Sequence, residues 1–242
     1  MRVVSLVPSV TETLLSWGVT PIAVTRFCEQ PSLPTIGGTK DPDVAAIVAL
    51  EPDLVVVCDE ENRREDADAL AGHGVPLYVI STDSVDDVGP SLEELRQVMG
   101  LAPHPLRLPA AEEVRAFAAA PVRAFVPIWR RPWMTMSGRC YGSSLLAHLG
   151  VENVFGQALD RYPVVELDEV AAREPEVVLA PSEPYPFSAR HLEELERIAP
   201  VMFVDGKDLF WWGARTPDAL VRLAAELAAE LPGLISASSR TG

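Results

Sequence analysis

The chain has 242 residues, a formal net charge of −15 at pH 7 and 48% hydrophobic residues, so it is a globular protein large enough for one big domain or two lobes. The acidic balance argues against nucleic acid and anionic lipid surfaces as partners, because both require basic patches. No run of about 18 apolar residues occurs, so we expect no membrane-spanning helix and no membrane insertion.

The first half is predicted to alternate strands with helices. Residues 3–19, VVSLVPSVTETLLSWGV, run from an apolar strand through a proline-containing loop into an amphipathic helix that ends near Gly18. Residues 46–61, AIVALEPDLVVVCDEE, predict a short helix and then an apolar strand. The helix should end at Glu51, because the residue before a proline is driven out of the α region. Residues 75–81, VPLYVIS, add another strand.

The chain enters its first strand directly. The segment MRVVSLVP is preceded by no signal region and no lipid-anchoring cysteine, so the sequence as given predicts a cytoplasmic protein. An upstream start that encodes an export signal would instead predict a periplasmic or other extracytoplasmic protein.

A helical connector is predicted between the two halves, over residues 85–121. Leu92 and Leu95 follow helical spacing there. Prolines at positions 103, 105 and 109 are expected to break the connector into at least two pieces. A helical connector is much stiffer than a Gly/Ser linker.

The second half repeats the first. Residues 169–184, EVAAREPEVVLAPSEP, match residues 46–61 at an offset of 123, and residues 124–151 repeat the strand, loop and helix of the N-terminus. Residues 200–206 supply a further strand. Strands that alternate with helices predict parallel sheets covered by helices. We therefore predict an α/β fold with two lobes, residues 1–84 and 122–242, joined by the 85–121 connector.

The candidate binding residues follow the predicted strands. Open α/β sheets bind ligands at the carboxyl ends of their strands. The densest stretch is 127–142, PIWRRPWMTMSGRCYG, in which Trp129, Arg130 and Trp133 could form an aromatic wall with a cationic arm. Such a wall suits a planar macrocycle that carries carboxylate or amide groups. The alternative is a loop that folds onto its own lobe. Aromatic residues also occur at other strand ends: Phe27, Tyr185, Trp211 and Trp212.

The ordered set of these segments resembles the helical-backbone solute-binding proteins of ABC transporters, which receive cobalamin, ferric siderophores or haem. The resemblance extends over nearly the whole chain and is nearest to the cobalamin-binding members. It rests on IAVTRFCEQP (22–31), IGGTKDPDVAAIVALEPDLVVV (36–57) and ENRREDADALAGHGVPLYVI (61–80), together with AAREPEVVLAPSEPY and VDGKDLFWWGARTPDAL in the second half.

The resemblance implies capture of a ligand in a cleft between the lobes, without turnover. It places Phe27, Thr39 and Lys40 at the rim, and Trp211, Trp212 and Arg215 in the last pocket loop. Of the two tryptophans, Trp211 is expected to pack inward and Trp212 to face the ligand. The resemblance also implies docking to a permease through one glutamate per lobe. The full set of expected ligand residues is Arg26, Phe27, Thr39, Lys40, Trp129, Arg130, Trp133, Glu183, Tyr185, Trp211, Trp212 and Arg215, and the expected docking residues are Glu65 and Glu193.

The sequence leaves two alternative functions. A cytosolic ligand chaperone or sensor on the same scaffold would suit a chain without an export signal. An enzyme is disfavoured, because Ser9 and Ser143 lack a plausible histidine partner and no glycine-rich phosphate loop occurs. Cys28 could ligate a metal, although a free cysteine is more often a small buried hydrophobe. We expect no catalytic residues, no prosthetic group, no metal held by the protein's own side chains, and a monomer.

Overall fold

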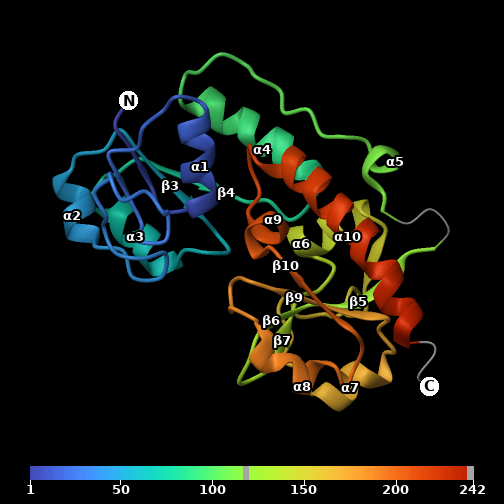
Figure 1. The fold of residues 1–242 in the computed structure, drawn as a ribbon. Helices are drawn as coiled ribbons and strands as arrows, with labels where there is room; N and C mark the ends of the chain where they lie inside the picture. The colour runs from blue at the N-terminus through green and yellow to red at the C-terminus, as the bar shows by residue number, and fades with distance from the viewer. Residues whose placement is uncertain (117–119, 239–242) are drawn as a thin grey trace. The chain divides into compact units, whose positions relative to one another are not determined.

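A computed structural model describes residues 1–116 and 120–238, and the chain forms two compact units (Figure 1). Residues 117–119 of the expected connector lie outside the described residues. Residues 86–106 of the expected connector belong to the first unit. The short segment 212–215 belongs to the first unit as well. The first unit consists of Met1–Thr82, Asp86–Leu106 and Trp212–Arg215, and the second of Asp83–Val85, Arg107–Trp211 and Thr216–Gly242.

The first unit is built on a four-stranded parallel sheet in the order β2-β1-β3-β4. Val4 pairs with Val55 in register, and both side chains lie in one apolar core with Ile47 of α2 and Leu70 of α3. All four are completely buried. The elements are β1 (Val3–Ser5), α1 (Pro8–Ser16), β2 (Ala23–Val24), α2 (Val44–Ala49), β3 (Leu54–Cys58), α3 (Arg64–Gly72) and β4 (Leu77–Ile80).

The second unit has its own four-stranded parallel sheet, in the order β10-β9-β5-β8, and a two-stranded antiparallel hairpin of β6 and β7. Phe125 and Phe155 pack at its centre with 6.0 Å between their ring centroids. The strands are β5 (Val122–Phe125), β6 (Pro127–Trp129), β7 (Met134–Thr135), β8 (Val151–Asn153), β9 (Val177–Pro181) and β10 (Val201–Val204). The helices are α6 (Tyr141–His148), α7 (Leu167–Ala172), the 3₁₀ turn η1 (Ala189–His191), α8 (Leu192–Leu195), α9 (Gly206–Phe210) and α10 (Thr216–Ser238).

The two sheets have the same topology, because β2-β1-β3-β4 corresponds to β8-β5-β9-β10. Glu51 and Glu174, which precede the repeated prolines, have left-handed φ values of 45° and 49°. Arginine side chains close both helix ends alike: Arg2 donates to the carbonyls of residues 50 and 51, and Arg123 to those of residues 173 and 174. The predicted α/β fold with a repeated half is therefore confirmed.

The segment between the repeats contains two helices. Helix α4 (Val85–Val98) carries the predicted helical spacing of Leu92 and Leu95, both buried, and α5 (Ala111–Val114) is a single turn. Residues 101–110, which include the three prolines, form no regular element. None of the helices within residues 1–116 and 120–238 is long and apolar enough to cross a membrane.

Candidate functional site

The second unit gathers aromatic side chains behind the ends of β6 and β9. We call Trp129, Trp133, Tyr185, Phe187 and His191 the aromatic cluster. Tyr185 meets Trp129 edge-on at 5.6 Å between ring centroids, and Trp133 stacks on Phe187 with 8° between the ring planes. Phe187 and His191 are buried, whereas Trp129 is 44% exposed. The cluster therefore holds one large aromatic side chain at the surface by packing it on a buried base.

His191 fixes the orientation of Tyr185. Its Nδ1 accepts the backbone N–H of Ser188 at 3.0 Å, and its Nε2 lies 3.3 Å from the Tyr185 hydroxyl and 3.2 Å from Nε of Arg190. Burial lowers the pKa of His191, and the nearby charges of Arg190 and Arg130 lower it further. The Tyr185 hydroxyl is therefore held beside the His191 ring.

Arg130 is fixed by an ion pair. Its guanidinium reaches both carboxylate oxygens of Glu194, with Nε to Oε2 at 2.9 Å. The hydrogen bond from Arg130 lowers the pKa of Glu194. The Arg130 Cζ also lies 5.7 Å from the centroid of the Trp133 ring. Glu194 therefore orients the planar guanidinium of Arg130 beside the Trp133 ring, within the same unit.

Trp211 belongs to the second unit and is half-buried. Its indole N–H donates to Oε2 of Glu183 at 3.1 Å, and the Lys207 ammonium lies 5.1 Å from the ring centroid. Glu183 follows β9 and Lys207 lies in α9, so the carboxyl end of the sheet brings these side chains together. The structure thus assembles the predicted Trp211 and Glu183 into one group.

In the first unit, the predicted rim residues lie on two adjoining loops. The Arg26 guanidinium pairs with Asp41 at 2.8 Å and lies 4.9 Å from the centroid of Phe27, which is 50% exposed. The hydrogen bond from Arg26 lowers the pKa of Asp41. A side chain at Gly38 would place Cβ 2.8 Å from the Arg26 Cζ, so any larger residue there would displace the paired side chains.

Lys40 lies over the acidic loop that follows β3. Its Nζ donates to the backbone carbonyl of Glu60 at 3.1 Å. Burial and, to a lesser extent, the charge of Glu60 raise the pKa of Glu61 to about 7, while Lys40 opposes the shift. Near neutral pH, Glu61 is therefore a partly protonated carboxyl group at the carboxyl end of β3, a property the sequence did not indicate.

The two tryptophans are placed in the reverse of the expected order. Trp212 is only 3% exposed, whereas Trp211 is half-buried. Trp212 begins the segment that joins the first unit, where the Ala214 N–H donates to Thr13 Oγ1 of α1 at 3.0 Å. The expectation that Trp211 is the buried tryptophan and Trp212 the exposed one is therefore wrong. The reason is that the Ala214 hydrogen bond holds the 212–215 segment against α1. Arg215 lies beside Glu12 of the same helix, with 3.5 Å between Nε and Oε2.

Cys28 is a buried hydrogen-bonding residue. Its Sγ lies 3.2 Å from the hydroxyls of both Thr11 and Thr25, and the side chain is 3% exposed. This network joins the Phe27 loop to α1 and agrees with the buried alternative for Cys28. Within the part of the chain that the structure describes, no three or more His, Cys, Asp or Glu side chains are grouped to hold a metal ion.

The expected docking glutamates are both exposed. Glu65 lies in the first turn of α3, and Glu193 lies on α8, where it pairs with Arg197 at 2.9 Å. They lie on different units.

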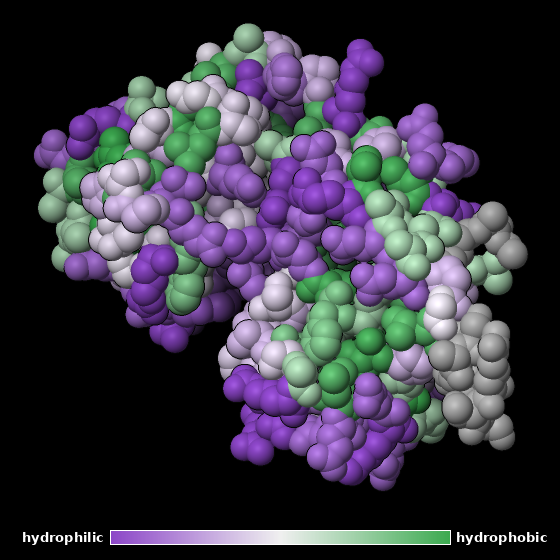
Figure 2. Space-filling model, in the orientation of Figure 1, coloured by the Kyte–Doolittle hydropathy of each residue, from purple (hydrophilic) through white to green (hydrophobic). Residues whose placement is uncertain are grey.

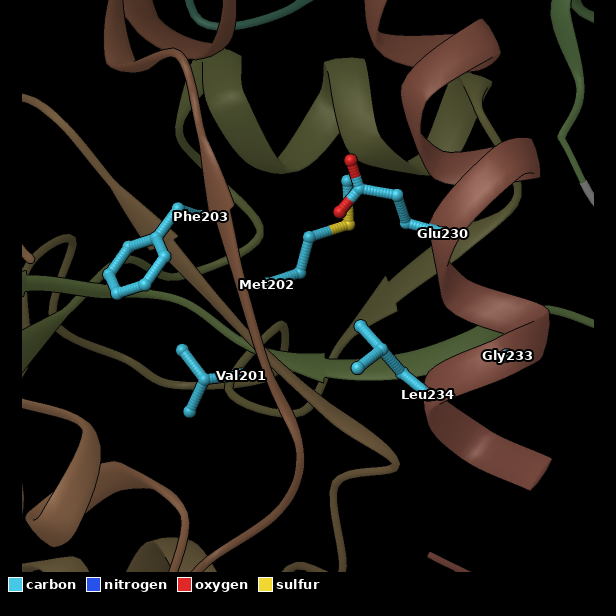
Figure 3. A pocket seen from close by; sticks show the side chains of 6 residues that line it. All are labelled: Val201, Met202, Phe203, Glu230, Gly233 and Leu234. Atoms are coloured by element: carbon cyan, nitrogen blue, oxygen red, sulfur yellow. The ribbon is translucent and has the colours of Figure 1, made fainter. Parts of the chain in front are cut away.

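A separate cavity of about 550 Å³ opens between β10 and α10 in the second unit (Figure 3). Met202 points toward Glu230, whereas Phe203 points to the other side of the strand, as alternation along β10 requires (Figure 3). Figure 2 shows apolar surface over this part of the second unit, amid largely hydrophilic surface elsewhere. The cavity contains none of the predicted ligand residues. Its lining is Val201, Met202, Phe203, Glu230, Gly233 and Leu234.

Sequence analysis missed several residues that shape these groups. Phe187 lies two residues after Tyr185, and this spacing across Pro186 is the one sequence feature that could have indicated that the two rings lie together. Glu194 is 64 residues from Arg130 and Asp41 is 15 from Arg26, so neither pairing has a local signature. No sequence pattern marks His191 as the partner of Tyr185.

Several known proteins similar to this chain are named for the ligand class that the sequence indicated. A vitamin B12-binding protein of Vibrio parahaemolyticus is 29% identical over 206 residues, which cover 78% of this chain and 71% of that protein. A vitamin B12-binding protein of Yersinia pestis is 28% identical over 74% of this chain and 68% of its own length. A search against protein-family models found no match.

Solved structures share the fold across both units. The periplasmic vitamin B12 binding protein BtuF of Vibrio cholerae aligns with a TM-score of 0.74 at 19% identity, over 95% of this chain and 98% of that one. The periplasmic heme-binding protein BhuT, in complex with two hemes, aligns with a TM-score of 0.76 at 19% identity and the same coverage. The sequence relatives and the shared fold together confirm the predicted resemblance of this chain to the helical-backbone solute-binding proteins of ABC transporters.

Proposed function

We propose that the chain captures a metal-chelate ligand of the corrinoid or haem type for an ABC importer and releases it unchanged. The observation that carries the proposal is the aromatic cluster, in which the exposed ring of Trp129 packs edge-on against Tyr185 while the guanidinium of Arg130, oriented by Glu194, lies over Trp133. An exposed aromatic face beside an arginine suits a flat macrocycle with polar substituents. The sequence relatives named for vitamin B12 binding support the same class of ligand.

The local charge supports an acidic or amide-bearing ligand. The whole chain is strongly acidic, yet Arg130, Lys207 and Arg26 all lie beside the aromatic residues that we assign to binding. Such residues orient carboxylates and carbonyls of a ligand, while the rings cover its apolar face. The residues assigned to binding in this proposal are Arg26, Phe27, Thr39, Lys40 and Arg215 of the first unit and Trp129, Arg130, Trp133, Glu183, Tyr185 and Trp211 of the second, whereas the buried Trp212 is left out.

A corrinoid is our first choice of ligand, because the long sequence matches carry that name. Haem is the second candidate, and Tyr185 is the observation that favours it. Haem iron takes an axial His, Cys, Met or Tyr from its protein, and the Tyr185 hydroxyl is held in place by His191. Corrinoid capture does not need that oxygen as a ligand.

Two variants separate these ligands. Tyr185→Phe keeps the ring and removes the hydroxyl, so it should abolish the shift in the haemin absorbance spectrum if haem is ligated there, and should leave cyanocobalamin affinity unchanged. Trp129→Ala removes the aromatic face and should weaken either ligand by about 1–3 kcal/mol, the scale of a large aromatic contact. Recovery of chemically altered ligand after incubation would contradict capture without turnover.

Delivery to a permease is the second part of the proposal. Structural neighbours are described as periplasmic, and delivery of this kind places the chain outside the cytoplasm. We propose Glu65 and Glu193 as the docking residues, since both are exposed and each unit carries one of them. The double variant Glu65→Lys/Glu193→Lys should keep its ligand affinity and fail to stimulate the ATPase of the importer in proteoliposomes.

A ligand chaperone or sensor in the cytosol is the alternative to delivery. Fractionation of the source cells, with detection of the native chain, distinguishes the two. Detection of the protein only in the cytosol would contradict the delivery role, while leaving ligand capture itself in place. We expect a monomer, because ligand delivery by one chain needs no second copy, and sedimentation velocity measures it.

A further inference from the structure

Asn62 is a buried side chain that the proposed function does not use. It follows the acidic loop after β3 in the first unit. Its amide Nδ2 donates to the backbone carbonyl of Thr39 at 2.9 Å and to that of Leu6 at 3.3 Å. Its Oδ1 accepts the backbone N–H of Cys58 at 2.7 Å. One side chain therefore makes three hydrogen bonds to three separate backbone segments.

These three segments meet at the carboxyl end of the first sheet. Leu6 directly follows β1, Cys58 is the last residue of β3, and Thr39 lies in the turn that leads to α2. The amide orientation is determined by its partners, because two carbonyls require the NH₂ group and one N–H requires the oxygen. No other side chain of this size offers two donors and an acceptor in this arrangement.

We propose that Asn62 is a positioning residue of the ligand site, which holds the turn of Thr39 and Lys40 against the ends of β1 and β3. The inference rests on the proposed function, since Thr39 and Lys40 are among the residues assigned to ligand binding. Asn62 touches no ligand in this proposal and acts through the backbone that carries those two residues.

Backbone hydrogen bonds from Arg26 N to Gly37 O and from Ile36 N to Val24 O hold the start of the turn, whereas the other side-chain ties to residues 39–41 are weaker. Lys40 reaches the carbonyl of Glu60, and Asp41 pairs with Arg26, but the side chains in both contacts are exposed to water. Exposed ion pairs contribute little to stability, whereas a buried hydrogen-bond partner is costly to lose. The bonds of Asn62 therefore join the Thr39 part of the turn to the ends of β1 and β3 through one buried side chain.

Asn62→Asp is the informative variant, because it keeps the shape and the acceptor for the Cys58 N–H. It turns a carboxylate oxygen toward the carbonyls of Thr39 and Leu6, and these contacts become repulsive. The matched control is Asn153→Asp in the second unit. Asn153 is buried in the same way: its Nδ2 donates to Met136 O and Ser143 Oγ, both at 2.8 Å, and its Oδ1 accepts from Phe155 N at 2.9 Å.

Hydrogen–deuterium exchange of the ligand-free proteins tests the tie itself. Amides of the turn, such as those of Gly38 and Asp43, are hydrogen-bonded within residues 36–43. We expect them to exchange faster in Asn62→Asp than in the wild type, and to be unchanged in Asn153→Asp. Unchanged exchange of residues 36–43 in a folded Asn62→Asp protein would overturn the inference, whatever the ligand proves to be.

Titration with cyanocobalamin and with haemin tests the consequence for binding. In Asn62→Asp the affinity of the probe that binds wild type should fall about tenfold, because binding must then order the turn. It should recover in part as the pH is lowered and the new carboxyl group regains a proton to donate, a recovery that the wild type and Asn153→Asp lack. Faster exchange without any loss of affinity would overturn the positioning role. If wild type binds neither probe, the proposed function fails, and the exchange measurement still decides whether Asn62 holds the turn.

Discussion

At the residue scale, neighbouring side chains of this protein have different environments and therefore different roles. Trp211 and Trp212 are adjacent in the chain, yet one bonds to Glu183 of the second unit and the other lies buried in a segment of the first. The sequence could predict that two adjacent tryptophans point apart. It could not predict which one is buried, because that depends on a contact with Thr13, which is 201 residues away from Ala214.

Replacing each tryptophan separately should give opposite results. Trp212→Ala should lower the free energy of unfolding by about 3–5 kcal/mol, the cost of emptying a core position. Trp211→Ala should cost less stability and should weaken ligand binding, since it removes a half-buried ring that we assign to the site. Chemical denaturation and titration of both variants provide the comparison. Equal losses of stability with unchanged affinity in both would mean that the pair is purely structural.

Glu61 should make the stability of the protein depend on pH near neutrality. Its pKa is raised from 4.5 to about 7, chiefly by burial, so the folded state holds the proton more tightly than the unfolded chain. The free energy of unfolding should therefore decrease as the pH rises through this interval. Glu61→Gln removes the titrating group and should flatten the profile between about pH 5 and pH 8.

Denaturant unfolding across that pH range measures the effect of Glu61. Glu65→Gln is the control, because it removes one carboxylate from an exposed position on α3. An identical pH profile for wild type and Glu61→Gln would contradict the assigned burial of this carboxyl group.

At the scale of elements, the turn of residues 36–43 shows how local backbone chemistry positions candidate site residues. Gly37 has a φ of 88°, and a Cβ there would lie 2.3 Å from the backbone oxygen of Asp41. A Gly-Gly pair such as Gly37-Gly38 is typical of a turn, so this feature is visible in the sequence. The pairing of Arg26 with Asp41 and the tie through Asn62 were not predictable, because they join separate loops.

Gly37→Ala should open this turn. A non-glycine residue at this φ and this close contact should destabilise the protein by roughly 1–3 kcal/mol. Because Thr39 and Lys40 follow directly, the affinity for the ligand should fall as well. Thermal melts and ligand titrations of the variant test both effects.

Gly72→Ala is the matched control for the turn. Gly72 lies in α3, and a Cβ there meets no atom within 4 Å. Alanine should therefore stabilise the helix by up to about 1 kcal/mol and leave binding unchanged. If both substitutions have the same effect, the geometry of Gly37 is not what holds the turn.

At the scale of the whole molecule, the internal repeat was the most informative feature of the sequence. The Glu-Pro pairs 123 residues apart correctly predicted two parallel sheets, and the structure extends the correspondence to the full strand order and to Arg2 and Arg123. Repeated local patterns are visible in sequence because each half forms the same elements for the same local reasons. The return of residues 212–215 to the first unit was not visible, since only long-range contacts specify it.

The candidate site was also only partly predictable, because local patterns are visible in the sequence and long-range contacts are not. Residue type and position at strand ends identified Trp129, Arg130, Tyr185 and Trp211, which the structure places in packed or paired groups of the second unit. Their partners Glu194 and His191 were missed, because hydrogen-bond partners distant in sequence leave no periodic signal. The sequence therefore indicated the candidate side chains, and the structure shows the residues that orient them.

Isothermal titration of the purified chain with cyanocobalamin, repeated with haemin, tests the central claim most directly. The account predicts saturable binding of one of the two with a Kd below about 10 µM, and recovery of that ligand with its absorbance spectrum unaltered after release. Saturable binding of neither, or conversion of the ligand into another compound, would contradict it.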